Sequence, residues 1–423
     1  MTSNACNEVS SDAERWNDVK QLNDIFLVHQ YLREHPNTPY KSQAESLFIS
    51  LKQNEIREML KQNTEYDAER LIRIINEGVI SENEIINSKV VTKPVLETLK
   101  SLKTVHGDIL DIHVAMNSYM AECKEGYTDV YFFGVPASGR TCLIASLLCS
   151  NLVHVNLAAG AGDYALALQQ YIDAGLTIPR TPGTFVTAIE TTIRSMMSAE
   201  AEAKVNFIVV PGEEYALNIA FNPERIFEFE DMGVSSVRLL QNNNRKVFFF
   251  IIDPTHYAVR INRDIVDGYD ENTGAPITHL EYCVVNQRTL IQKMVNIFEN
   301  PGNAEIMKKV DSINFVMTKS DRLGNAVERE KKAREIFNNK FANRILEPLI
   351  SLCKKYNINS STEFHPQLYT FSIGKFYPGW VFEYDSTDSD RLAEAIRSFC
   401  HNNRPKRWWE KIKDVRWVRR SKS

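Results

Sequence analysis

The stretch "FFGVPASGRT" at residues 132–141 decides how the chain is interpreted. Four residues separate Gly134 from Gly139, and Thr141 supplies a hydroxyl shortly afterwards. An apolar run precedes the glycines, and the helical pattern "TCLIASLLCS" follows them. Glycines between a strand and a helix let backbone N–H groups close around an anion, and the helix N-terminus adds a favourable dipole. The stretch therefore predicts a phosphate-binding loop, with a tight turn without a ligand as the alternative.

Arg140 stands where such loops commonly have a lysine that reaches the outer phosphates of a nucleotide. Arginine keeps the charge and forks onto phosphate oxygens, but its side chain is longer and planar, so the exchange is not conservative. The Thr141 hydroxyl is expected to bind Mg²⁺ as well. The expected phosphate contacts come from Gly134, Ser138, Gly139, Arg140 and Thr141.

Apolar runs indicate the fold of the region that begins near residue 128. They read "DVYFFG", "VNFIVVPG", "KVFFFIID", "INFVMTKSD" and "LYTFSIG". Such nearly unbroken apolar runs are typical of strands that are buried on both faces, as in a parallel sheet covered by helices. In these sheets, function gathers in the loops after the carboxyl ends of the strands. We therefore predict an α/β fold with a mostly parallel sheet flanked by helices.

The residues before this sheet have a helical pattern. Apolar positions recur at three-to-four spacing between residues 15 and 105. Gly78 marks a helix end, and Ser81 with Glu84 predicts a capping box at the start of the next helix. We expect these helices to bind protein partners, after a flexible start. The predicted domains are a helical N-terminal domain, a sheet domain and a basic tail, at 1–106, 107–400 and 401–423.

A second sequence element follows the fourth apolar run. In "MTKSDRLG", the residues Thr318, Lys319 and Asp321 match the pattern [N/T]-K-x-D at the end of a strand. A carboxylate at this place accepts hydrogen bonds from the ring N–H and the exocyclic amine of guanine, and adenine lacks that pair of donors. A site built for this pair leaves buried groups unpaired when the wrong base enters. The element therefore predicts guanine recognition.

Together, the two elements resemble those of P-loop GTPases of the translation-factor-like (TRAFAC) class. The layout is similar to bacterial GTPases of conflict-system and double-GTPase operons, and the resemblance covers residues 128–400. It implies GTP or GDP and Mg²⁺ as ligands. It also implies that the loop "FSIGK" at 371–375 lies over the guanine, with Ser372 and Ile373 in the matching places.

The same resemblance implies residues around the outermost phosphate. "VVPGEEY" is similar to the pattern D-x-x-G by Gly212, whose N–H would contact the γ-phosphate, and Glu213 takes the place of the catalytic glutamine. The switch threonine falls in "IPRTPGTF", where Thr184 is preferred over Thr181 as a catalytic residue and Mg²⁺ ligand.

Departures from the family pattern bear on hydrolysis. Val209 stands in place of the aspartate that holds a magnesium-bound water, and Arg140 replaces the lysine. A carboxylate at Glu213 is repelled by the γ-phosphate unless it is protonated or bound to a metal. Phosphoryl transfer depends on positioning and charge neutralisation. We therefore expect nucleotide binding with weak or partner-dependent GTP hydrolysis, in a protein that works as a switch.

Two alternatives remain open at this stage. One is a degenerate GTPase-like scaffold that binds proteins without nucleotide turnover. The other is a P-loop ATPase, because the apolar run in "KVFFFIIDP" is followed by Asp253, as in a Walker B segment. In ATPases of that kind, an additional strand separates the two Walker segments, and the aspartate holds Mg²⁺.

Composition limits the classes of function. The net charge of −4 argues against extensive nucleic-acid binding, and the seven scattered cysteines form no C-x-x-C pair that would indicate zinc or a disulfide framework. The N-terminus has no secretory pattern and the longest apolar run is "VFFFII" at 247–252, so we expect a cytoplasmic protein.

The tail from residue 404, "RPKRWWEKIKDVRWVRRSKS", differs from the rest of the chain. It holds nine Lys/Arg residues against two acids, and three tryptophans. A basic amphipathic segment with tryptophans suits an anionic membrane surface, such as the inner face of the membrane, an acidic partner or nucleic acid. The alternative is that the tryptophans dock on the protein itself.

Overall fold

The computed structural model describes residues 3–108, 122–178, 185–195, 202–211, 234–254, 266–269 and 276–402. The chain forms two compact units. The first, the helical unit, contains the N-terminal helices together with Ala174–Thr177 and Lys375–Glu383. The second, the sheet unit, contains the rest of the α/β region.

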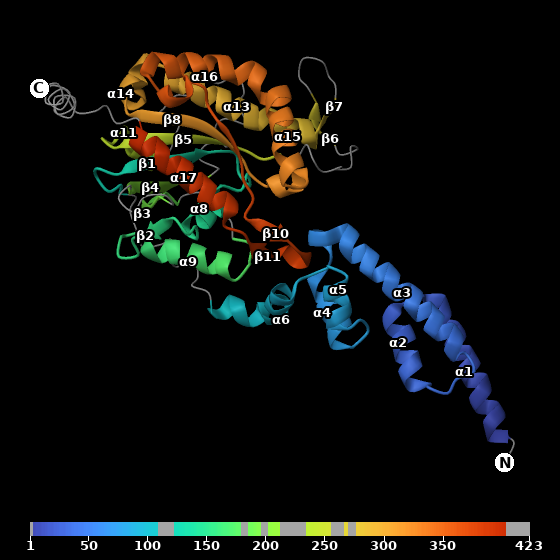
Figure 1. The fold of residues 1–423 in the computed structure, drawn as a ribbon. Helices are drawn as coiled ribbons and strands as arrows, with labels where there is room; N and C mark the ends of the chain where they lie inside the picture. Colours follow the sequence, from blue (N-terminus) through green and yellow to red (C-terminus); the bar gives the residue numbers. More distant parts are fainter. Residues whose placement is uncertain are drawn as a thin grey trace, which may run out of the picture. The chain divides into compact units, whose positions relative to one another are not determined.

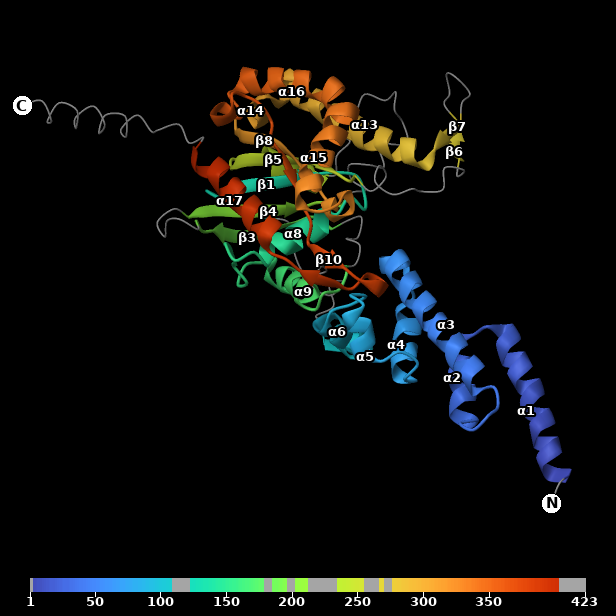
Figure 2. The same cartoon turned by 45° about the vertical axis from the view of Figure 1, so that its right-hand side comes forward.

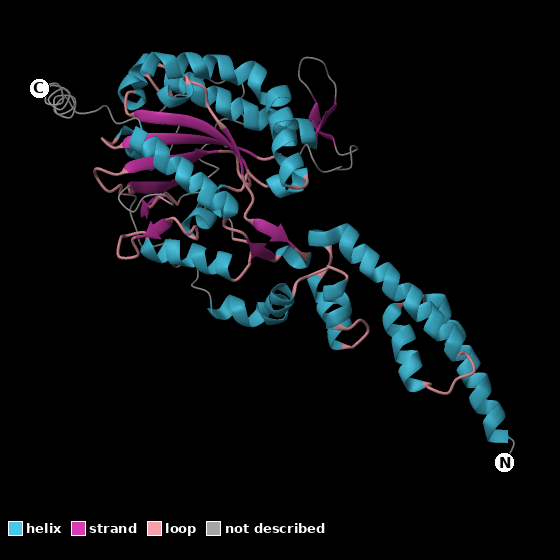
Figure 3. Cartoon of the chain, viewed as in Figure 1, coloured by secondary structure: helices cyan, strands magenta, loops and turns pink. Residues whose placement is uncertain are grey.

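The helical unit confirms the predicted helical region before the sheet (Figure 3). α4 ends at Asn76, and Gly78 follows with φ +71°, a left-handed conformation that glycine adopts at low cost. At the next helix, Ser81 and Glu84 form the predicted capping box. The helices are α1 (Ser3–Leu22), α2 (Ile25–Glu34), α3 (Lys41–Gln62), α4 (Ala68–Asn76), α5 (Glu82–Asn87) and α6 (Lys93–Asp108).

The sheet unit is built on a mostly parallel sheet with the strand order β2-β3-β4-β1-β5-β8-β9. The strands β4, β1, β5, β8 and β9 are mutually parallel, and they correspond to the five predicted runs. β3 pairs antiparallel with both β4 and β2, which the sequence did not predict. Their bounds are β1 (Thr128–Phe133), β2 (Val153–Val155), β3 (Thr187–Ile193), β4 (Ala203–Val209), β5 (Arg245–Ile252), β8 (Val310–Met317) and β9 (Leu368–Thr370).

Helices cover both faces of this sheet, which confirms the predicted α/β class. α13, α15 and α16 lie on one face, while α8 and α17 lie on the other (Figures 1 and 2). The helices of the unit are α8 (Arg140–Leu148), α9 (Gly162–Asp173), α11 (Val234–Gln241), α13 (His279–Glu299), α14 (Ala304–Met307), α15 (Ala326–Phe337), α16 (Asn343–Tyr356) and α17 (Thr387–Asn402). Two short strand pairs complete the described elements, β6 (Val266–Tyr269) with β7 (Pro276–Thr278), and β10 (Gly374–Phe376) with β11 (Phe382–Tyr384).

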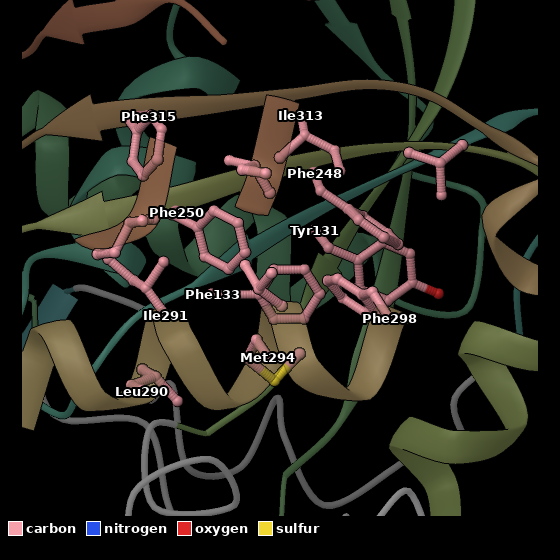
Figure 4. Packing of buried hydrophobic residues seen from close by; sticks show 14 of the residues in the cluster. Tyr131, Phe133, Phe248, Phe250, Leu290, Ile291, Met294, Phe298, Ile313 and Phe315 are labelled. Atoms are coloured by element: carbon pink, nitrogen blue, oxygen red, sulfur yellow. The ribbon is translucent and has the colours of Figure 1, made fainter. Parts of the chain in front are cut away.

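Alternate residues of the central strands build the two apolar layers. Phe133 of β1 and Phe248 of β5 contact Phe298 of α13, with ring centroids 5.9 and 5.1 Å apart (Figure 4). On the opposite face, Phe249 lies 6.3 Å from Phe399 of α17. All of these rings are buried, which explains why the apolar runs are unbroken.

A polar network lies at the amino ends of these strands. The Asp129 carboxylate accepts hydrogen bonds from the amides of Asn206, Asn242 and Asn244 at 2.6–2.9 Å. Lys246 is fully buried, and its ammonium donates to the Asn242 side chain and to the backbone carbonyls of Asn242 and Asn244. Burial lowers the pKa of Lys246 to about 8, although Asp129 acts in the opposite direction. Among the described residues, only the Asn206 Oδ1 atom of this network lacks a hydrogen-bond partner. This end of the sheet is therefore a structural network, and the predicted site lies at the other end.

Candidate functional site

The predicted phosphate loop connects β1 to α8. Residues 134–139 form the turn, and α8 begins at Arg140. Gly139 has φ +82°, which a side chain would make unfavourable. At Gly134, an added Cβ would lie 2.8 Å from Ser138 Oγ and 2.9 Å from Ile251 Cβ, so only glycine fits. The two glycines thus hold the backbone close to the N-terminus of α8, the end of a helix that favours an anion.

The element at 318–321 that predicts guanine recognition, called the guanine element below, contacts the predicted phosphate loop directly. Thr318 follows β8, and its hydroxyl donates to the Ser138 carbonyl at 2.6 Å. The Lys319 ammonium donates to the Ala137 carbonyl at 2.8 Å. Both Ala137 and Lys319 have left-handed backbone conformations, with φ of 59° and 50°. Such conformations in residues other than glycine persist where the surroundings impose them, which is common at functional sites. The two elements, 180 residues apart in sequence, therefore form one structure.

Asp321 lies in the short 3₁₀ turn Ser320–Leu323 that follows. Its Oδ1 atom is buried and has no hydrogen-bond partner among the described residues. Burial raises the pKa of the Asp321 carboxyl, and Ser372, Arg322 and Arg329 act in the opposite direction. A buried carboxylate oxygen without a partner is costly unless a ligand completes it.

The loop after β9 carries the predicted residues Ser372 and Ile373, which are 7% exposed each. The preceding residue, Phe371, accepts a hydrogen bond from the Ser320 N–H at 3.1 Å, which connects this loop to the turn of Asp321. The Ser372 N–H donates to Asp388 at 2.9 Å, and its hydroxyl donates to the Gly374 carbonyl at 3.0 Å. The loops after β1, β8 and β9 are thus connected at the carboxyl edge of the sheet.

Asp253 directly follows β5, and its environment argues against a metal-binding role. The Lys319 ammonium lies 2.5 Å from Asp253 Oδ2, and the Asp253 side chain is 5% exposed. β5 pairs directly with β1, so no strand separates them as the ATPase alternative requires. Asp253 instead places Lys319 beside the phosphate loop.

Several predicted residues lie outside the described part of the chain, namely Thr181, Thr184, Gly212 and Glu213. The structure does describe Val209 at the end of β4, where it is 3% exposed. An apolar side chain at this position supplies no oxygen to a magnesium-bound water, as the sequence indicates.

The fit of Mg²⁺ to the described residues is limited. No cluster of three or more His, Cys, Asp or Glu side chains suited to a metal occurs among them. The hydroxyl of Thr141, in the first turn of α8, is the candidate protein ligand of Mg²⁺. Mg²⁺ commonly keeps several waters and binds through substrate phosphates and one or two protein oxygens, so this single ligand is compatible with it.

Three further residues of this edge were not predicted from the sequence. Ala137 receives the Lys319 hydrogen bond, while Asp388 and Arg329 support the loop of Ser372. The one feature of the sequence that could have pointed to Asp388 is that it is an acid in the first turn of a helix. Their roles depend on contacts between distant segments.

Among the described helices, none is both long and apolar enough to cross a membrane.

Comparisons with known proteins give little guidance to the family. No family model matches the chain. No curated protein matches its sequence. Among solved structures, the chain is similar to Toc33 from Arabidopsis thaliana in complex with GDP and Mg²⁺, with 12% sequence identity and a TM-score of 0.29. The match covers 73% of this chain and 93% of that one. A likeness of this degree assigns neither a family nor a function to the chain.

Proposed function

We propose that the chain binds a guanine nucleotide across the loops after β1, β8 and β9, and that it works as a nucleotide-dependent switch. The observation that carries this proposal is the pair of hydrogen bonds from Thr318 and Lys319 to the carbonyls of Ser138 and Ala137. In the proposal, these bonds hold the base-recognition element against the phosphate loop. A nucleotide whose base contacts one element and whose phosphates contact the other needs the two at a fixed distance.

The phosphate end is formed by the loop backbone and α8. In the proposal, the loop residues Gly134, Ser138 and Gly139 contact phosphate oxygens, and the Arg140 guanidinium forks onto the outer phosphates. Thr141 would hold Mg²⁺ together with those phosphates. Bound there, the ion supplies neutralisation of phosphate charge.

The base end rests on Asp321 and the loop of Ser372 and Ile373. The buried Oδ1 atom of Asp321 lacks a partner among the described residues, and the two donors of guanine would complete the carboxylate. Adenine presents no such pair, so it would leave the carboxylate unsatisfied. Ser372 and Ile373 cover the base from the neighbouring loop.

Hydrolysis is proposed to be weak or to depend on a partner. Val209 provides no carboxylate beside the magnesium ion, and Arg140 positions charge differently from lysine. Thr184 and Glu213 are the candidate catalytic residues, with Thr184 as a second Mg²⁺ ligand and Gly212 at the γ-phosphate. Nucleotide state would order the segments around these residues, and a partner would read the result.

Protein partners are proposed to bind through the N-terminal helices. The basic tail at 404–423 is proposed to contact an anionic membrane surface or an acidic partner, on the composition of its sequence.

The test is thermal unfolding with GDP, GTP, ADP and ATP, each with Mg²⁺. At a nucleotide concentration 100 times Kd, binding stabilises the folded state by about 2.7 kcal/mol, and we expect GDP and GTP to raise the unfolding midpoint by about 5 °C. ADP and ATP should raise it little. Equal protection by adenine nucleotides would support the ATPase, and no protection by any nucleotide would support the scaffold.

A matched pair of variants separates base recognition from general stability. Thr318→Val removes the hydroxyl that reaches Ser138, and it should reduce the protection by GDP. Thr362→Val removes a hydroxyl that also donates to backbone carbonyls, those of Asn359 and His365, and it should keep the protection.

A further inference from the structure

Asp388 is a buried carboxylate that no sequence element predicts. It lies in the first turn of α17 and is 5% exposed. Its Oδ2 atom accepts the Ser372 N–H at 2.9 Å, in the loop proposed to cover the base. The backbone of that loop is therefore held by a side chain from a different element.

Arg329 of α15 holds Asp388 in turn. Its two terminal nitrogens lie 3.0 and 3.1 Å from the two carboxylate oxygens, which is the fork geometry of a strong arginine–carboxylate pair. Arg391 adds a contact at 3.1 Å, from one turn further along α17. Burial raises the pKa of Asp388, and the two arginines and the Ser372 N–H act in the opposite direction. The carboxylate is thus surrounded by donors that favour its charged form.

Arg329 also influences the carboxylate proposed to recognise the base. Its positive charge opposes the effect of burial on the pKa of Asp321. α15 begins at Ala326, shortly after Asp321, so the same helix follows the guanine element directly. One guanidinium therefore acts on both Asp388 and Asp321.

The first turn of α17 is itself fixed to α8. The hydroxyls of Ser389 and Ser146 lie 2.6 Å apart, and Asp390 accepts a hydrogen bond from Ser150 at 2.6 Å. Because α8 begins at the phosphate loop, Asp388 stands on an element with a defined position relative to that loop. Side chains locked in this way are suited to hold a binding loop within a narrow range of positions.

We propose that Asp388 and Arg329 are positioning residues for guanine selection, because they fix the backbone of Ser372 against the edge of the base beside Asp321. This inference rests on the proposed guanine-nucleotide site. Neither residue contacts the nucleotide in the proposal. They act through Ser372, so their loss should affect the choice of base more than the binding of phosphates.

The test compares dissociation constants of GDP and ADP, with Mg²⁺, for the full chain and its variants. For Asp388→Ala we expect GDP binding to weaken about tenfold, as for loss of a charge-assisted hydrogen bond, while ADP binding changes less than about twofold. Arg329→Gln should have a similar effect. Arg329→Lys keeps the charge without the fork, so it should lose less selectivity than Arg329→Gln.

Glu394→Gln is the matched control. Glu394 lies on the same helix and pairs with Arg397, so the variant removes an acid from an acid–arginine pair away from the loop. Its ratio of GDP to ADP affinity should equal that of the wild type. If Asp388→Ala does not fold, the two Arg329 variants make the same comparison.

The outcomes separate the inference from the function on which it rests. A selective wild type whose Asp388 and Arg329 variants keep the same GDP-to-ADP ratio would overturn the positioning role alone. Equal weakening of GDP and ADP would also overturn it, since a merely structural role affects both. A wild type that binds no guanine nucleotide selectively would overturn both proposals.

Discussion

Replacing Lys319 by methionine tests how the guanine element supports the phosphate loop. The Lys319 ammonium lies 2.8 Å from the Ala137 carbonyl and 2.5 Å from Asp253 Oδ2. Methionine has a similar length but no donor. The Asp253 carboxylate, whose side chain is 5% exposed, would lose this cation, and Ala137 would lose its donor. The variant should therefore destabilise the sheet unit and weaken GDP binding.

The expected magnitude follows from the burial of the pair. Removing one partner of a fully buried ion pair costs roughly 3–5 kcal/mol. The Lys319 side chain is 33% exposed, so water replaces part of the interaction, and we expect about 2–3 kcal/mol. Asp253→Asn should cost about 1–2 kcal/mol, because the amide oxygen still accepts a hydrogen bond. The double variant should cost less than the sum, by about 1–2 kcal/mol.

Urea unfolding measures these free energies. The transition to follow is the one that GDP shifts, because that transition reports the unfolding of the sheet unit. Lys332→Met is the control, since Lys332 forms an exposed pair with Glu328 and its loss should have little effect. If the destabilisation of the double variant equals the sum of those of Lys319→Met and Asp253→Asn within about 0.3 kcal/mol, the coupling between the two residues is refuted. Loss of all Mg²⁺-dependent nucleotide binding in Asp253→Asn would instead identify Asp253 as a metal ligand.

Three more predictions follow from the same region and from the core. Ala137→Gly should raise the free energy of unfolding by about 0.5–1 kcal/mol. The relief of the left-handed alanine backbone outweighs the greater freedom of glycine in the unfolded chain, and a lower unfolding midpoint would argue against strain at Ala137. Burial raises the pKa of Asp321 despite Arg322 and Arg329, and guanine binding needs the charged carboxylate, so GDP affinity should fall as pH drops through that raised pKa; titrations that stay flat down to pH ~4, the unperturbed value, would contradict this. Burial lowers the pKa of Lys246 to about 8, so the unfolded state binds more protons above that pH, and wild-type stability should rise with pH relative to Lys246→Met. The gain should reach up to about 3 kcal/mol by pH ~10.5, and parallel pH profiles of the two proteins would contradict it.

The sequence predicts the parallel core well because its signal is local. Each central strand is buried on both faces, so its residues are apolar without interruption, as in "VFFFII" at 247–252. β3 has no such signal, since "TAIETTI" mixes polar and apolar residues although most of them are buried. The capping box of Ser81 and Glu84 was predictable for the same local reason.

The candidate site was predictable only where a backbone conformation or a ligand imposes residue types. Gly134 and Gly139 follow from close approach and left-handed geometry. Asp321 is predicted from the donors of guanine, and its role remains a proposal. Asp388 and Arg329 act through contacts between α17, α15 and the loop after β9, and no spacing in the sequence encodes those contacts. The expectations for Thr184, Gly212 and Glu213 fall outside the described residues and remain predictions.

The central claim is that Asp321 recognises the Watson–Crick edge of guanine. Calorimetric titration of GDP and xanthosine diphosphate, with Mg²⁺, into the wild type and Asp321→Asn tests it most directly. Xanthine carries an oxygen where guanine carries the amine, so an asparagine amide complements xanthine while aspartate complements guanine. The account predicts GDP binding by the wild type, and its loss in Asp321→Asn together with a gain of xanthosine diphosphate binding. Equal binding of GDP by both proteins, or no binding of either nucleotide by either protein, would contradict it.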